Sequence, residues 1–113
     1  MNIENQITTL VENIKEDYLR WTSRNYTKEL SEINENMIAE FNEKISWNEG
    51  SKYIKIITNG SVWGFVVAVN NDKKFKYGDI LKAAGWNAPA RNAARGNVFE
   101  DYDIQWTGPN YLR

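Results

Sequence analysis

The stretch Lys52-Tyr53-Ile54-Lys55-Ile56-Ile57-Thr58, followed by Asn59-Gly60 and by Val62-Trp63-Gly64-Phe65-Val66-Val67-Ala68-Val69, predicts a β-hairpin. Its first segment alternates in part and is rich in β-branched and aromatic residues, which favour strands. Asn-Gly is the strongest short hairpin signal, because both residues tolerate positive φ. The second segment is almost continuously apolar, which indicates a central strand covered on both faces. We expect Trp63 and Phe65 to share one face, with Val62 and Val66 on the other.

Upstream of this hairpin, the apolar residues follow a helical period. Spacings of three and four residues place them on one face of an amphipathic helix. Asn2 and Thr27 are candidate N-caps for the two helices. We expect both apolar faces to pack into the core, and a homodimer seam is the alternative. One stripe contains Ile3, Ile7, Leu10, Ile14, Tyr18 and Trp21, and the other contains Tyr26, Leu30, Ile33, Met37, Phe41 and Ile45.

Downstream, residues 75–99 carry a dense set of helix start and stop signals. Asp79 can cap a short helix that Gly85 ends, because glycine adopts the left-handed conformation at low cost. Asn87 can cap a second helix, with Pro89 in its first turn, where the missing N–H costs nothing. Gly96 can end that helix. The sequence therefore predicts a short helical pair, followed by a last strand near residues 102–106.

These elements predict an α+β fold in one domain covering residues 1–113. A helical half, residues 1–46, precedes a β-rich half, residues 47–113, which contains the helical pair at 79–96. We expect an N-terminal helical hairpin packed on a small antiparallel sheet. With 113 residues, of which 42% are apolar, the chain can bury a substantial core.

Composition argues against common catalytic machinery. The chain has no Cys and no His, which excludes disulfides, thiolate nucleophiles and the commonest general base and metal ligand. Glu100, Asp101 and Asp103 form an acidic cluster, and hard cations such as Mg²⁺ favour carboxylates, but the cluster lies beside a predicted turn, where charges are normal. We predict a protein that is not an enzyme and that uses no cofactor and no metal. The N-terminus lacks signal-peptide features and no run is long enough to span a membrane, so we expect a cytoplasmic protein without a membrane partner.

The charge distribution indicates a candidate binding surface. Residues 1–50 carry five basic and ten acidic residues, whereas residues 51–113 carry nine and five. Such asymmetry suggests a surface that faces a polyanion. On the predicted second helix, Arg91 and Arg95 would share one face, and Trp86 could stack on a base. The candidate ligand-binding residues are Lys74, Lys76, Lys82, Trp86, Asn87, Arg91, Asn92 and Arg95.

A second interpretation of the same residues is structural. Trp86 would then belong to the core, and the arginines would pair with the acidic N-terminal helices. Both interpretations stay open from the sequence.

Several motifs resemble small uncharacterised proteins of tailed bacteriophages. They are residues 76–86, Ala88-Pro89-Ala90-Arg91, Arg95-Gly96-Asn97 and Trp106-Thr107-Gly108-Pro109, with Arg20-Trp21-Thr22-Ser23-Arg24 and Lys52-Tyr53-Ile54-Lys55-Ile56 further upstream. The resemblance spans most of the chain and implies no known activity and no functional residues. It implies a setting in the host cytoplasm and an accessory role, such as nucleic-acid handling or inhibition of a host protein.

We therefore predict a non-catalytic accessory protein that binds nucleic acid or another phosphate-bearing ligand through residues 73–95. The alternative is a protein-interaction module, or an inhibitor of a host protein, that acts through the helical half or through exposed aromatic residues.

Overall fold

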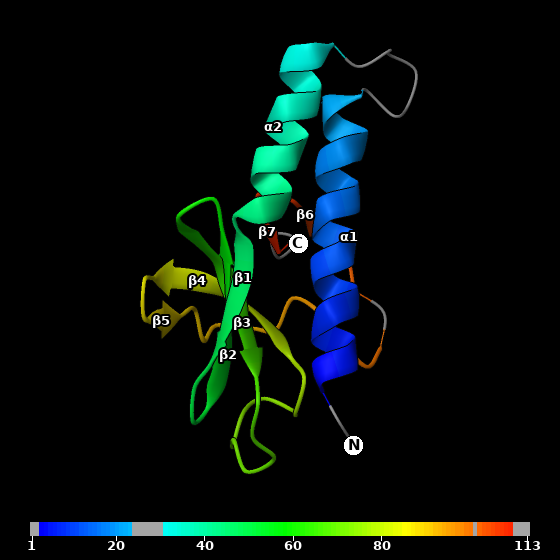
Figure 1. The fold of residues 1–113 in the computed structure, drawn as a ribbon. Helices are drawn as coiled ribbons and strands as arrows, with labels where there is room; N and C mark the ends of the chain where they lie inside the picture. Colours follow the sequence, from blue (N-terminus) through cyan, green and yellow to red (C-terminus); the bar gives the residue numbers. More distant parts are fainter. Residues whose placement is uncertain (1–2, 24–30, 101, 110–113) are drawn as a thin grey trace.

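The computed structural model of the chain describes residues 3–23, 31–100 and 102–109. Two helices, α1 (Glu4–Thr22) and α2 (Glu32–Glu43), precede the strands β1 (Ile45–Glu49), β2 (Tyr53–Thr58), β3 (Ser61–Val67), β4 (Ile80–Gly85) and β5 (Ala88–Pro89). These five strands form one antiparallel sheet in sequence order, and β6 (Ile104–Gln105) pairs with β7 (Gly108–Pro109) in a separate ribbon. The predicted α+β class is confirmed, with the helical hairpin packed on an antiparallel sheet (Figure 1).

The first helix follows its predicted stripe closely. Ile7, Leu10, Ile14 and Tyr18 are buried, because their spacing turns all four toward the sheet. Trp21, at the end of the stripe, is exposed. The candidate cap Asn2 lies outside the described residues.

The second helix departs from its predicted stripe. α2 begins after Ser31, whose hydroxyl accepts a hydrogen bond from the Asn34 N–H at 3.2 Å. Only Phe41 of the predicted stripe is buried within α2, while Ile33 and Met37 are exposed and Ile45 opens β1. The remaining members of that prediction, Tyr26, Thr27 and Leu30, lie outside the described residues.

The hairpin predicted around Asn59-Gly60 is confirmed. Both residues have positive φ, 47° and 82°, and they join β2 to β3. Both strands lie inside the sheet, between β1 and β4. This central position explains the nearly continuous apolar run of β3, since the helices cover one face and a smaller cluster with Phe75, from the β3–β4 connection, covers the other.

The prediction that Trp63 and Phe65 share a face is wrong, because β3 contains a bulge. Gly64 pairs with Ile56 and Val62 pairs with Ile57, which leaves Trp63 as an extra residue. Trp63 therefore joins the core beneath the helices, while Phe65 joins the opposite cluster. The indole N–H of Trp63 donates to the Gln105 carbonyl at 2.8 Å.

The predicted helical pair at residues 79–96 is also wrong, because this segment extends the sheet. β4 pairs with β3, and the two-residue β5 pairs with β4. Ile80 and Leu81 alternate into the two buried clusters, as strand residues do. Without β4, the edge of β3 would have unpaired backbone N–H and C=O groups. Pairing with these groups outweighs the local capping signals that favour a helix.

Each predicted cap in this segment has another role. Asp79 is buried, and its carboxylate accepts from the Lys76 N–H and from the Asn97 side-chain amide, both at 2.9 Å. Gly85 ends β4 rather than a helix, and Gly96 forms a bridge to Tyr102. The Asn87 side chain accepts from Lys55 instead of capping a helix.

The core consists of two clusters on opposite faces of the sheet. The larger one lies beneath the helices and joins α1 and α2 to Ile54, Ile56, Trp63, Val66 and Ile80. The smaller one contains Phe65, Val67, Phe75 and Leu81. The second face is therefore the less thickly covered one, and polar side chains gather along it.

Candidate nucleic-acid interface

The sheet face that points away from the helices carries an ionic clamp. Arg91 donates two hydrogen bonds to the Asp72 carboxylate, each at 2.9 Å, and another to the Tyr53 hydroxyl. Lys52 lies 3.3 Å from the same carboxylate, whose side chain is almost fully buried. The Arg91 guanidinium also lies over the Phe75 ring, 4.8 Å from its centroid. The clamp therefore holds the segment after β5 against the start of β2.

Hydrogen bonds fix the charge state of this clamp. Donation by Arg91 holds the pKa of the Asp72 carboxyl well below its ordinary value, and the N–H groups of Lys74 and Phe75 lower that pKa further. The same bond to Asp72 raises the pKa of Arg91. The Asp72 carboxylate is consequently ionised at neutral pH, and both of its oxygens accept hydrogen bonds.

Two more lysines lie around this clamp. Lys73 lines a pocket of about 440 Å³ together with Lys52 and Arg91. Lys74 donates from its amine to the Arg91 carbonyl at 2.6 Å. Three lysines and one arginine thus surround a single carboxylate, so the pocket has an excess of positive charge that can attract an anion.

An exposed tryptophan with a lysine above it lies further along the same face. Trp86 is 54% exposed in the turn between β4 and β5. The Lys55 amine lies 4.9 Å from the Trp86 ring centroid and donates to the Asn87 side chain at 2.5 Å. Lys55 and Asn87 also line a second pocket of about 290 Å³ with Lys52 and Tyr53. Lys55 therefore lies over one face of the indole, and proteins that bind single strands combine such aromatic rings with basic side chains.

These groups form one continuous surface, which we call the basic face: Lys52, Tyr53, Lys55, Lys73, Lys74, Trp86, Asn87 and Arg91. Tyr53 and Lys55 are two residues apart on β2, so both point away from the helices, opposite Ile54 and Ile56. Tyr53 contacts the clamp through Arg91, and Lys55 contacts the tryptophan turn. Lys52 lines both pockets.

Of the eight predicted site residues, four lie on the basic face: Lys74, Trp86, Asn87 and Arg91. The alternative that Trp86 belongs to the core is wrong, because it is exposed. Arg91 pairs with Asp72 of its own half rather than with the N-terminal helices.

The other four predicted residues are used elsewhere. Lys76 pairs with Glu100 at 2.7 Å, which raises the pKa of the lysine. Lys82 is half-buried on β4, opposite Gly64. The Asn92 side chain accepts from the Ala93 N–H at 2.9 Å and from Arg95 at 3.5 Å. Without a helix, the four-residue spacing of Arg91 and Arg95 does not place them on a common face.

Sequence analysis missed Lys52, Tyr53 and Lys55 as members of this surface, and it included Lys73 only as the start of the segment 73–95. The alternation of β2 contained the signal for two of them, since Tyr53 and Lys55 are separated from the buried isoleucines by the strand period. Their position beside Trp86 and Arg91 depends on the order of the strands.

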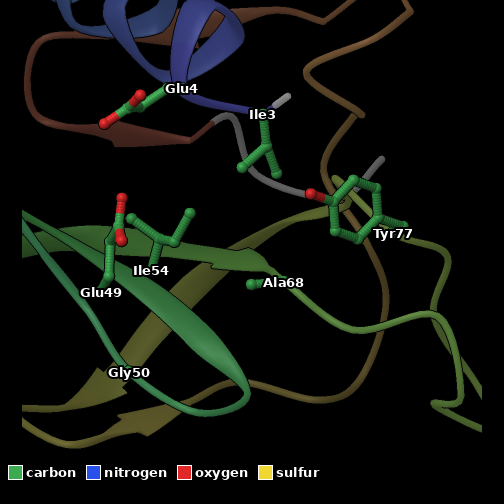
Figure 2. Close-up of a pocket in the computed structure, with 7 residues that line it drawn as sticks. All are labelled: Ile3, Glu4, Glu49, Gly50, Ile54, Ala68 and Tyr77. Atoms are coloured by element: carbon green, nitrogen blue, oxygen red, sulfur yellow. The ribbon is translucent and has the colours of Figure 1, made fainter. Parts of the chain in front are cut away.

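A third pocket, of about 330 Å³, lies on the other side of the sheet, between the start of α1 and the β1–β2 turn. Figure 2 shows Glu4 and Glu49 pointing toward one another across it, above Ile54 and Ala68. Glu49 also borders the pocket beside Lys55, but its carboxylate points toward the helix. Acidic groups therefore lie on the helical side, and the basic face retains its excess of positive charge.

Two kinds of site are absent from the described part of the chain. Across residues 3–23, 31–100 and 102–109, no three His, Cys, Asp or Glu side chains come together in a way that could hold a metal ion. Glu100, from the acidic cluster seen in the sequence, pairs with Lys76, and Asp101 lies outside the described residues. Neither described helix has the length and apolar character that crossing a bilayer requires.

The fold and this surface define a small α+β protein with helices on one sheet face and a basic, aromatic surface on the other. The chain belongs to a family of unknown function, DUF7717, whose model matches residues 1–110. No curated protein and no solved structure matches the chain.

Proposed function

We propose that this protein is a non-catalytic accessory protein that binds nucleic acid across its basic face, with single strands preferred over duplexes. The observation that carries the proposal is the grouping of Lys52, Lys73, Lys74 and Arg91 around one engaged carboxylate, on the same face as an exposed tryptophan that Lys55 contacts. The lysines supply contacts to phosphates, which contribute most of the affinity for nucleic acid.

Trp86 supports the preference for single strands. Its indole is accessible and lies next to the Lys55 amine, so an unstacked base could lie on the ring while its phosphate meets the lysine. Bases in a duplex are already stacked on one another and cannot use an isolated aromatic side chain in this way. The basic face itself carries no helix that would enter a major groove, because residues 79–96 contain the strands β4 and β5 and no helix.

A salt titration of binding tests the electrostatic part of the proposal. We would measure affinity for a labelled oligothymidine and a duplex of equal length, comparing wild type with the Lys55→Gln, Lys73→Gln double variant. Each phosphate contact contributes roughly 0.7 to the slope of log affinity against log salt for single strands. The double variant should bind more weakly and lose roughly 1.4 units of slope. Lys15→Gln with Lys44→Gln, on the helices, removes the same charge and should change little.

A second variant tests the role of the aromatic ring. Trp86→Ala should weaken binding of the single strand by about 1–3 kcal/mol, the usual contribution of one stacked base, and should affect the duplex less. The melting temperature should change little because the side chain is exposed. If wild type binds neither oligonucleotide at low salt, or if the helix variants weaken binding as much as the basic-face variants, the proposal is wrong.

A further inference from the structure

A second surface, independent of the basic face, lies where the helical hairpin extends beyond the sheet (Figure 1). Three large apolar side chains are exposed on the two helices: Trp21 at 58%, Ile33 at 72% and Met37 at 40%. Single exposed apolar residues are common, but a contiguous group of them on a soluble protein marks an interaction site.

Contacts join two of these side chains, Trp21 and Met37, through Tyr18 and Trp106, and the helical period adds Ile33. Trp21 lies 5.1 Å from Trp106 and 6.0 Å from Tyr18, measured between ring centroids. Met37 lines a pocket of about 220 Å³ with Tyr18, Phe41 and Trp106. Ile33 lies one turn before Met37, so both occupy the same side of α2. We call this surface the hairpin groove: Trp21, Ile33, Met37 and Trp106, above Tyr18 and Phe41.

The groove lies on the most acidic part of the chain. The described helical segments, residues 4–23 and 31–44, contain eight acidic and three basic residues. Glu40, which pairs with Lys44 at 2.7 Å, lines the pocket itself together with Met37. A second copy of this chain would bring the same acidic surface against itself, and like charges across an interface are unfavourable. A basic partner, in contrast, would be attracted.

We propose that the hairpin groove binds a basic amphipathic helix of another protein. The apolar side of such a helix would cover the exposed indole, isoleucine and methionine, and its lysines or arginines would meet the surrounding carboxylates. Two features of the groove suit this partner. Tryptophan is a frequent anchor of protein interfaces, and methionine adapts its shape to helical ligands. Laying an amphipathic helix along an apolar groove is also a recurrent mode of recognition.

The test uses the whole protein and a synthetic probe. The probe is a labelled 14-residue peptide of leucine and lysine arranged for an amphipathic helix, followed by anisotropy at low and moderate salt. Two control peptides accompany it: one with glutamine in place of leucine, and one with glutamate in place of lysine. We expect the wild-type protein to bind the leucine–lysine peptide and to bind each control at least tenfold more weakly.

Variants locate the site. Ile33→Ser with Met37→Ser should reduce affinity for the probe at least tenfold, and Ile33→Ser alone should reduce it severalfold, with the circular dichroism spectrum unchanged. Trp86→Ala removes an exposed apolar side chain from the other face and should leave binding of the probe unchanged. Because Trp86→Ala should weaken binding of the oligonucleotide and not of the peptide probe, this control also distinguishes the groove from the nucleic-acid site.

Four results would overturn the proposal. The first is that wild type fails to bind the probe, and the second is that the serine double variant binds it equally well. The third is that the glutamate peptide binds as tightly as the lysine peptide. The fourth is that sedimentation shows wild type self-associating and the serine double variant monomeric, since a second copy would then occupy the groove.

Discussion

The two faces of the central sheet differ in how they are stabilised. Beneath the helices, the face is closed by a large apolar cluster that reaches from α1 to Ile80. The other face has a small apolar cluster around Phe65, and its surroundings are held by the Asp72–Arg91 clamp. Apolar burial stabilises in proportion to area, whereas an ion pair with a buried carboxylate adds little net stability, because the cost of desolvation offsets the attraction between the charges. We therefore expect the helical face to determine stability and the basic face to be available for binding.

The largest effect should come from truncating the helical face. Ile14 is fully buried, so Ile14→Ala removes apolar contacts and leaves a cavity, which should cost about 2–5 kcal/mol of unfolding free energy. Ile57→Ala, at a half-buried position on the other face, should cost clearly less. Urea unfolding curves of both variants measure the difference. Equal losses of unfolding free energy in the two variants would contradict the expectation that the helical face determines stability.

The next effect concerns the polar connection between β4 and the residues that follow it. Asn97 donates to the Asp79 carboxylate at 2.9 Å and to the Tyr77 carbonyl at 3.0 Å. Asn97→Ala leaves buried acceptors without partners and should cost about 1–3 kcal/mol. Asn92→Ala, at an exposed position nearby, should stay within about 0.5 kcal/mol of wild type. A destabilisation by Asn92→Ala as large as that by Asn97→Ala would show that the segment is held differently.

A smaller effect should come from the hairpin that both faces share. Gly60 has a φ of 82°, which a β-branched residue resists. Gly60→Val should therefore cost on the order of 1 kcal/mol or more, with no clash, because no atom lies within 4 Å of the added carbon. Thermal melting measures the loss, and Ser61→Val on the adjoining strand is the control. An unchanged melting temperature would argue against the turn.

The smallest effect should be a dependence on pH that is confined to the basic face. The pKa of Asp72 is lower in the folded protein than in the unfolded chain, so its stabilisation is complete above the ordinary carboxyl pKa of about 3.9 and is lost as the pH falls further. The difference in melting temperature between wild type and Asp72→Asn should be greatest near neutrality and shrink in acid. A difference that stays constant down to pH 3 would show that the carboxylate charge is not what stabilises the clamp.

How much could be predicted from the sequence depended on whether a signal was local. The Asn59-Gly60 turn and the stripe of α1 were predicted correctly, because a two-residue turn and a helical period are properties of neighbouring residues. Residues 79–96 contained equally good local signals for helices, yet they contain the strands β4 and β5 and no helix. Sheet pairing with β3 is a contact between distant segments, and it outweighed caps that each contribute about 1 kcal/mol.

The candidate site was predicted in part for the same reason. Lys74, Trp86, Asn87 and Arg91 were selected by their charge or aromatic character, and they do lie on one face. Lys52 and Lys55 precede them by 19 to 39 residues, and only the pairing of β2 with β3, and of β3 with β4, brings them alongside.

The sequence alone determined the α+β class, the hairpin at its centre, the first helix, and a surplus of positive charge in the second half. Periodicity, turn chemistry and composition are enough for each of these. The tertiary structure decided that β4 and β5 complete the sheet and that a bulge at Trp63 turns this side chain to the opposite face from Phe65. It also decided that Arg91 binds Asp72. Each of these contacts joins residues that lie far apart in the chain. Which contact forms depends on which backbone groups and charges the rest of the fold leaves without partners.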